Sequence, residues 1–198
     1  MIELKNLACY HASTRIFGPI SHVFPDRSLT AITGPNGAGK STLLRAIAAR
    51  HSQYTGRITA GNCALLPQSS TLDRSFPATV FDAVSMGAWQ RIGAFRPLGA
   101  AERQRIDAAL GEVALTGLAD RSVGALSAGQ FQRLLCARLI VEDHENILLD
   151  EPFTAVDPET RDALIALIRR WHGQGKTLLV VLHDLDIAKT FPDTLALQ

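Results

Sequence analysis

A glycine-rich stretch near the N-terminus constrains this chain more than any other feature. Residues 34–42 read Gly-Pro-Asn-Gly-Ala-Gly-Lys-Ser-Thr and match the pattern G-x-x-x-x-G-K-[S/T]. A short apolar run, residues 29–33, precedes this stretch, and a helix-like run, residues 41–49, follows it. Glycine permits the positive φ angles and the close backbone approach that a loop around phosphate oxygens needs. The order of strand, loop and helix therefore predicts a phosphate-binding loop.

The residues of this loop are suited to the phosphates of a nucleotide and to Mg²⁺. Successive backbone N–H groups form a concave anion site, and the following helix adds the positive end of its dipole. Lys40 is expected to reach the β- and γ-phosphates, and the Ser41 hydroxyl is expected to bind Mg²⁺. A chance glycine-rich turn would leave the flanking strand and helix unexplained. The predicted contacts are Gly34, Pro35, Asn36, Gly37, Ala38, Gly39, Lys40, Ser41 and Thr42.

Composition favours one globular domain and argues against nucleic-acid binding, a membrane span, disulfide bonds and a zinc site. The chain has 198 residues, of which 46% are hydrophobic, and its formal net charge is +1. This near-neutral charge argues against nucleic acid as a partner. No apolar run reaches the roughly 18 residues that span a bilayer, and the N-terminus does not resemble a signal peptide. Three widely spaced cysteines fit buried thiols in a reduced cytosolic protein better than disulfides or a zinc site.

Short apolar runs predict the strands of a sheet. Residues 29–33 and 63–66 are short apolar runs and predict buried strands. Residues 146–150 and 177–182 are short and apolar throughout, as central strands of a parallel sheet are. Residues 2–7 alternate apolar and polar side chains, which is typical of an edge or antiparallel strand. The sequence thus predicts strands of two kinds.

A long segment without comparable strands predicts a helical insertion. Residues 100–113 and 128–141 within it favour helices. We expect one domain over the whole chain, with a core formed by residues 1–68 and 143–198 and a helical subdomain at about 69–142.

Five further motifs follow the glycine-rich loop along the chain. They are Leu-Pro-Gln at residues 66–68, Leu-Ser-Ala-Gly-Gln at 126–130, Ile-Leu-Leu-Asp-Glu-Pro at 147–152, Ala-Val-Asp-Pro at 155–158 and Leu-His-Asp at 182–184. In this order the series resembles the ATP-binding cassette (ABC) ATPases over nearly the whole chain. A different P-loop NTPase with accidental matches is the alternative. The resemblance implies an α/β fold: a P-loop NTPase core of ABC ATPase type, with a small antiparallel β subdomain and an inserted α-helical subdomain.

The resemblance also implies an ATP hydrolase with Glu151, His183 and Gln68 as catalytic residues. Glu151 corresponds to the general base that polarises the attacking water, and His183 to the histidine that contacts the γ-phosphate. Gln68 corresponds to the glutamine that senses Mg²⁺, the water and the transporter partner. Asp150 ends an apolar strand, where a carboxylate can hold Mg²⁺ through water, so Ser41, Gln68 and Asp150 are the expected metal residues. Two adjacent acids could instead mark a helix N-terminus, and His183 could be a packed core residue.

The motif at residues 126–130, called the signature motif here, implies a dimer. In this family it caps the γ-phosphate bound by the other subunit, through a head-to-tail pairing, and Ser127, Gly129 and Gln130 supply it here. A serine hydroxyl, a glycine and a helix N-terminus make an anion clamp. Ala128 stands where glycine is commoner, and its methyl group restricts the backbone if φ is positive there. Asp157 is expected to cap the helix that follows it and to organise the dimer seam.

An adenine contact is expected at Tyr10. By the resemblance, this side chain corresponds to the aromatic that stacks on the base near the N-terminus. Tyr10 could instead cap the first sheet.

Residues 69–87 narrow the kind of transporter. The Ser/Asp-rich start, the run Phe-Pro-Ala-Thr-Val-Phe-Asp and the final Met-Gly resemble ATPase subunits of zinc and manganese importers. Those importers work with a periplasmic or lipid-anchored metal-binding protein, whereas siderophore and cobalamin importers share a looser form of this region. Phe76, Val80 and Met86 could simply fill the core of the helical subdomain.

The resemblance therefore implies an ATPase that binds ATP and Mg²⁺ and energises import of zinc or manganese. Its expected partners are an identical or paired ATPase subunit, integral membrane permease subunits and, indirectly, the metal-binding protein. Its expected place is peripheral, at the cytoplasmic face of the membrane. A siderophore or cobalamin importer is the closest alternative. An ABC ATPase outside transport and a non-enzymatic nucleotide-binding module are the others.

Two departures from the family pattern are visible. The connection over residues 56–68 is shorter than usual, as if a hairpin of the antiparallel subdomain were trimmed. The sequence also stops at Gln198, soon after the histidine motif, so we expect either a minimal ATPase or a fragment.

Overall fold

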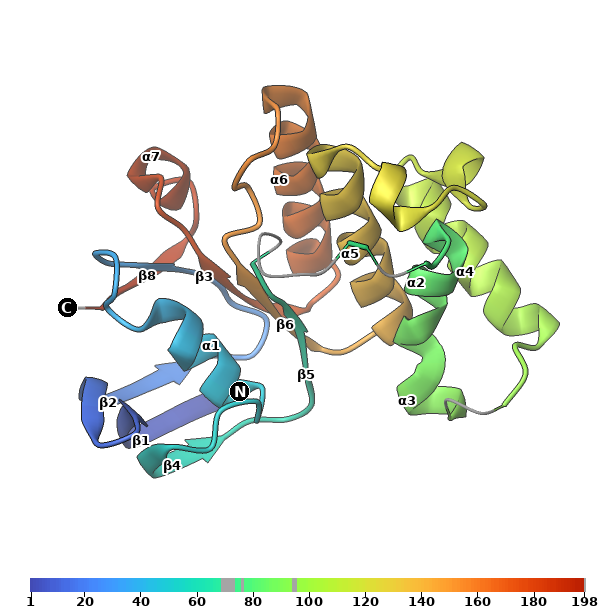
Figure 1. Ribbon diagram of the computed structural model, residues 1–198. Helices are drawn as coiled ribbons and strands as arrows, with labels where there is room; N and C mark the ends of the chain where they lie inside the picture. Colours follow the sequence, from blue (N-terminus) through green and yellow to red (C-terminus); the bar gives the residue numbers. More distant parts are fainter. Residues whose placement is uncertain (69–73, 76, 94–95, 198) are drawn as a thin grey trace. The chain divides into compact units, whose positions relative to one another are not determined.

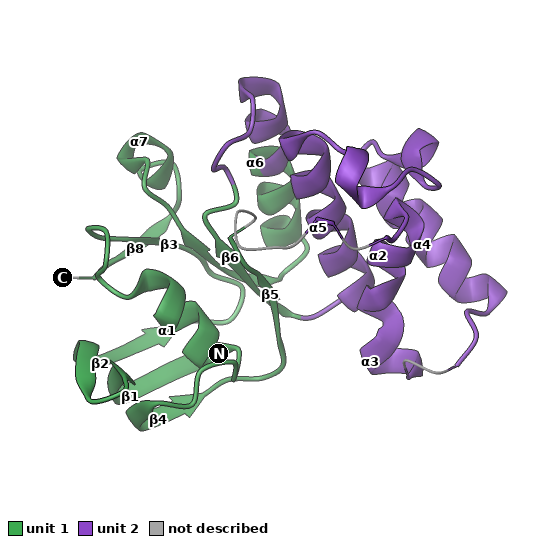
Figure 2. Cartoon of the chain, viewed as in Figure 1, with its two compact units in different colours: residues 1–68, 145–152, 165–198 green, residues 69–144, 153–164 purple. Residues whose placement is uncertain are grey.

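The computed structural model describes residues 1–68, 74–75, 77–93 and 96–197 (Figure 1). The chain divides into two compact units (Figure 2). Unit 1 contains residues 1–68, 145–152 and 165–198, and unit 2 contains residues 69–144 and 153–164. The predicted division into a core and a helical subdomain stays a prediction. Part of the resemblance to zinc and manganese importers depends on residues 69–73 and Phe76, which lie outside the described residues. Gln198, at which the sequence stops, also lies outside them.

Unit 1 begins with a three-stranded antiparallel sheet. Its strands are β1 (Ile2–His11), β2 (Thr14–Phe24) and β4 (Tyr54–Thr59), in the order β2-β1-β4. The alternation that predicted a strand at the N-terminus buries Ile2, Leu4 and other apolar side chains of β1. This sheet is the small antiparallel element expected of the fold.

A five-stranded parallel sheet completes unit 1. Its strands are β5 (Cys63–Leu66), β6 (Asn146–Asp150), β7 (Thr177–Val181), β3 (Leu29–Thr33) and β8 (Asp193–Ala196), in that order across the sheet. Every residue of β3, β6 and β7 is buried, which explains their almost continuous apolar sequence. Because all strands run in the same direction, their carboxyl ends share one edge, where ligands of open α/β sheets bind.

The core of unit 1 packs helix α1 (Lys40–Ile47) onto both sheets. Leu43 and Leu44 of α1 are fully buried in one apolar cluster with side chains of β1 and of the central parallel strands. Figure 1 shows α1 directly after the turn that follows β3. This packing holds the glycine-rich loop between a buried strand and a buried helix.

Unit 2 is built mainly from helices. Helix α5 packs against α2 and α4, and buried side chains such as Leu134 and Ile106 fill the contacts. Capping boxes start two of the helices, at Thr79 before α2 and at Ser127 before α5. The helices are α2 (Val80–Ser85), α3 (Trp89–Ile92), α4 (Ala100–Glu112) and α5 (Ala128–Glu142), with 3₁₀ turns at Met86–Ala88, Thr116–Leu118 and Val123–Ala125.

Two further helices follow the parallel strands. Helix α6 (Pro158–Gly173) lies between β6 and β7 along the chain, and its residues are divided between the two units. Helix α7 (Leu185–Ala188) is a short segment between β7 and β8. Within the ranges that the structure describes, no helix has both the length and the apolar character needed to cross a membrane.

Candidate active site

The glycine-rich loop joins β3 to α1 at the carboxyl edge of the parallel sheet. Its close packing on β2 explains one of the glycines: a Cβ atom on Gly39 would lie 2.5 Å from Phe17 Cδ1 and 2.8 Å from Ile16 Cγ2. The φ angle of Gly39 is 85°, a left-handed conformation that side chains rarely adopt. Gly39 therefore lets α1 begin directly against β2, and the first amides of this helix face the loop.

Lys40 is held at the centre of the loop although it is charged. Only 6% of its surface is exposed, and its Nζ donates hydrogen bonds of 2.9 Å to the carbonyl oxygens of Gly34 and Pro35. An ammonium group has three N–H donors. Two of them orient the side chain, and the third is suited to a phosphate oxygen.

Ser41 and Asp150 form a pair of oxygen donors. The Ser41 hydroxyl donates a 2.9 Å hydrogen bond to Oδ1 of Asp150, which is 4% exposed. Burial raises the pKa of Asp150 and the nearby Glu151 carboxylate adds to the rise, while the bond from Ser41 and the charges of Arg45 and Lys40 oppose it. A hydroxyl beside a carboxylate is a hard, oxygen-only donor set, so these residues fit Mg²⁺.

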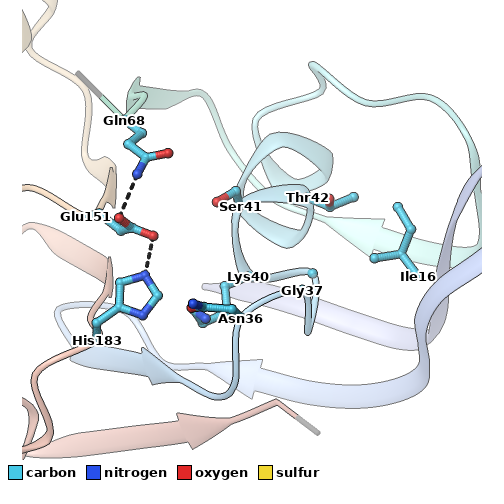
Figure 3. A pocket seen from close by; sticks show the side chains of 10 residues that line it. Ile16, Asn36, Gly37, Lys40, Ser41, Thr42, Gln68, Glu151 and His183 are labelled. Atoms are coloured by element: carbon cyan, nitrogen blue, oxygen red, sulfur yellow. Dashed lines mark hydrogen bonds and ion pairs between the residues drawn. The ribbon is translucent and has the colours of Figure 1, made fainter. Parts of the chain in front are cut away.

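Glu151 lies between two partners from neighbouring strand ends. Gln68, after β5, donates from Nε2 to Glu151 Oε2 at 2.8 Å, and Nε2 of His183, after β7, is hydrogen bonded to the other carboxylate oxygen. Figure 3 shows these three side chains in a row that faces Lys40 and Ser41. The φ angle of Glu151 is 52°, an uncommon value for a residue with a side chain. Three distant sequence motifs thus meet at one carboxylate.

These residues line a cavity of about 520 Å³ in unit 1. The described residues that line it are Ile16, Asn36, Gly37, Gly39, Lys40, Ser41, Thr42, Gln68, Glu151 and His183. All but Ile16 were predicted as site residues. The sequence holds no alternating pattern that singles out Ile16, because the adjacent Phe17 is also apolar. Its place in β2 brings it against Gly39 of the loop.

Tyr10, the predicted adenine contact, is not among the residues that line this cavity. It lies in β1, opposite Arg15 of β2, and its backbone N–H donates to the carbonyl oxygen of Gln53 at 2.8 Å. Its stacking on a base stays a prediction.

The signature motif lies in unit 2, at the N-terminus of α5. The backbone N–H of Gln130 donates to Ser127 Oγ at 3.2 Å, and the backbone N–H of Ser127 donates to Gln130 Oε1 at 3.0 Å. The serine hydroxyl keeps its own proton as a donor while the cap holds it in place. Ala128 is the first residue of the helix and is not among the residues with positive φ, so its methyl group meets no backbone strain.

Gly129 packs on the start of α6, which Asp157 caps. A Cβ atom on Gly129 would lie 2.7 Å from Thr160 Oγ1 and 3.1 Å from Asp157 Oδ2. The two carboxylate oxygens of Asp157 accept 2.8 Å hydrogen bonds from the N–H and the hydroxyl of Thr160. These two bonds lower the pKa of Asp157 below its usual range. The predicted helix cap is thus present, and it touches the signature motif.

Comparisons with known proteins agree on one group. A family model described as "ABC transporter" matches residues 17–154. The chain is 36% identical to the zinc transport system ATP-binding protein TroB of Treponema pallidum, over 99% of the chain and 77% of that protein. It is 37% identical to the manganese transport system ATP-binding protein MntB of Listeria monocytogenes, over 100% of the chain and 86% of that protein.

Similarity extends to a solved structure. An ABC transporter in an inward-facing conformation matches with a TM-score of 0.89 and 30% sequence identity, over 100% of the chain and 79% of that chain.

Proposed function

The chain belongs to the ABC transporter family of ATPases, and we propose that it is the ATP-hydrolysing subunit that energises import of manganese or zinc through a separate membrane permease. One observation carries the catalytic part of this proposal. The Glu151 carboxylate is held by Gln68 and His183 opposite the phosphate-binding loop, as a base for an attacking water must be.

Binding of ATP is assigned to the glycine-rich loop and α1. The loop amides and Lys40 would hold the β- and γ-phosphates, and the two carbonyl contacts of Lys40 orient its charge before the nucleotide arrives. Ser41, Asp150 and Gln68 would hold Mg²⁺, which neutralises charge on the phosphate oxygens. Ile16 is added to the predicted contacts because it lines the same cavity.

Hydrolysis is assigned to the row of three side chains. Glu151 accepts a proton as the water oxygen bonds to the γ-phosphorus, and the bond to the bridging oxygen of ADP breaks. Gln68 and His183 orient the carboxylate through its two oxygens. Lys40 stabilises the negative charge that the γ-phosphate oxygens carry during the transfer.

The second half of each site is assigned to a second ATPase subunit. Ser127, Gly129 and Gln130 would close over the nucleotide of the partner, since Ser127 keeps a hydroxyl donor at the N-terminus of a helix of fifteen residues. Asp157 would support the same surface through its cap on α6. We propose one ATPase domain, peripheral at the cytoplasmic face of the membrane, whose helical part contacts the permease.

The identity of the transported metal is inferred from the relatives. The two named here, at 36% and 37% identity over nearly the whole chain, are subunits of zinc and manganese transport systems. The transported ion would be recognised by the binding protein and the permease, because the carboxylates of this chain's site are arranged for Mg²⁺.

Reconstitution with the permease in proteoliposomes tests the proposal. ATP hydrolysis is measured with the binding protein loaded with manganese, loaded with zinc, or metal-free, and Glu151→Gln serves as the inactive control. We expect stimulation by one metal-loaded form and none by the metal-free form. Stimulation by a siderophore- or cobalamin-loaded protein instead, with no response to either metal, would contradict the assignment.

A further inference from the structure

We propose that Arg74 is a positioning residue that holds the chain on both sides of Ser127 and so fixes the signature motif at the start of α5. The inference rests on the proposed function, because it matters only if the signature motif closes on a nucleotide.

The side chain of Arg74 contacts the chain on both sides of Ser127. Its Nη2 donates a hydrogen bond to the carbonyl oxygen of Leu126, the residue directly before the serine. Its guanidinium carbon lies 4.6 Å from the centre of the Phe131 ring, in the first turn and a half of α5. One side chain thus spans the helix start at which the signature motif is displayed.

The backbone of Arg74 is also close to this region. A Cβ atom on Gly124 would lie 3.2 Å from the carbonyl oxygen of Arg74. Gly124 belongs to the 3₁₀ turn Val123–Ala125, whose first carbonyl oxygen accepts a 3.2 Å hydrogen bond from the N–H of Leu126. Main chain and side chain of residue 74 therefore pack on the same short segment before Ser127.

The contact is directional, which distinguishes it from simple core filling. Leu126 and Phe131 are each 5% exposed, and the partly buried side chain of Arg74 meets both of them. Nε of Arg74 is buried and has no hydrogen-bond partner among the described residues. Leaving a polar N–H without a partner is costly, and an apolar side chain would avoid the cost. The planar guanidinium combines a bond to a carbonyl oxygen with stacking on a ring.

The carbonyl oxygen that Arg74 binds gives the contact a role. It belongs to Leu126, the neighbour of Ser127. In the proposed function, Ser127 serves the nucleotide of the partner. Arg74 would therefore hold the signature motif in the position that closes on that nucleotide.

Arg74→Met tests this role, because it keeps a long side chain but loses the charge and the donors. Arg103→Met is the matched control: Arg103 also stacks on a phenylalanine of unit 2, at 5.7 Å from Phe81, but lies on the exposed face of α4. The measurements are kcat, the Hill coefficient for ATP hydrolysis, and the Kd of the isolated subunit for a non-hydrolysable ATP analogue.

We expect Arg74→Met to lower kcat about tenfold and to bring the Hill coefficient close to one, with the Kd for the analogue unchanged within about twofold. Arg74→Lys, which retains a charge and a donor, should recover part of the lost kcat. Arg103→Met should behave like the wild type. A merely structural role would instead lower the melting temperature and weaken analogue binding together, and that result would overturn the inference.

Two further results keep the inference separate from the proposed function. If Arg74→Met folds poorly, Phe131→Leu removes the ring contact with little loss of apolar volume and should reduce cooperativity in the same direction. Wild-type kcat and cooperativity in both variants would refute the role of Arg74. A wild-type chain that hydrolyses no ATP, or does so without cooperativity, would instead count against the proposed dimeric ATPase.

Discussion

The hydroxyl of Ser41 donates a 2.9 Å hydrogen bond to Oδ1 of Asp150, a residue 109 positions later in the chain. The bond joins the first turn of α1 to the end of β6, the second strand along the sheet from the β5 edge. It brings together two of the three residues that the sequence assigns to Mg²⁺. Asp150 is also buried, and a buried carboxylate that carries a charge lowers the stability of the fold.

Asp150→Asn should therefore stabilise the fold at neutral pH. Burial raises the pKa of Asp150 in the folded chain, so the folded state favours the protonated carboxyl. The stability that this proton contributes is fully present below the ordinary pKa of 3.8 and is lost as the pH rises through the raised value. Asparagine keeps an acceptor for Ser41 and does not ionise. Urea unfolding at pH 4 and pH 8 should show a gain in the free energy of unfolding that grows with pH. Hydrolysis should fall by about a hundredfold or more, since a metal ligand is lost. A variant less stable than the wild type at pH 8 would contradict this reasoning.

Ser127→Arg should destroy hydrolysis and leave ATP binding to the isolated subunit near normal. The reason is that the signature motif is assigned to the nucleotide of the partner. Lys40→Ala should instead weaken nucleotide binding as well as hydrolysis, because it removes the cation held at the loop by two carbonyl oxygens. Fluorescence titration with an ATP analogue separates the two variants.

The mixture of these two variants is informative. An equimolar mixture should rebuild at most one composite site in each mixed dimer and so recover part of the activity. Loss of analogue binding by Ser127→Arg alone would place the signature motif in its own nucleotide pocket, and the head-to-tail pairing would be wrong.

Gly129→Ala should destabilise the protein by roughly 1–2 kcal/mol, although alanine favours helices more than glycine does. The new Cβ would lie 2.7 Å from Thr160 Oγ1, and this hydroxyl is fixed by its bond to Asp157. Gly111→Ala is the control within α4, where the nearest atom would be 3.7 Å away, and it should be neutral or stabilising by up to about 1 kcal/mol. Equal effects of the two substitutions in thermal unfolding would show that the Thr160 contact does not restrict residue 129.

Buried strands were predictable from sequence and exposed strands were not. The structure places β3, β5 and β6 at the predicted residues, because short apolar runs buried on both faces leave little ambiguity. Strands β4 and β8 consist largely of exposed residues, and their sequences carry no comparable pattern. Their place depends on partners that are distant along the chain.

The sequence motifs likewise predicted which residues belong to the site, but they did not predict which of these side chains contact one another. The meeting of Gln68, Glu151 and His183 follows from the order of β5, β6 and β7 across the sheet, which local sequence does not encode. The contact between Gly129 and Thr160 also joins segments that are far apart in the chain. The roles of these residues in catalysis stay predictions until they are measured.

The molar mass of Glu151→Gln in the presence of Mg-ATP tests the central claim most directly, because the claim is that two subunits close over ATP and Glu151 then drives hydrolysis. Glutamine keeps the shape of the side chain but cannot accept the proton of water, and it removes negative charge from the closed site. Light scattering after gel filtration should show a monomer without nucleotide and a dimer that retains ATP with it, and Ser127→Arg added to the same variant should restore the monomer. A monomer at saturating Mg-ATP, together with hydrolysis at the wild-type rate, would contradict the account.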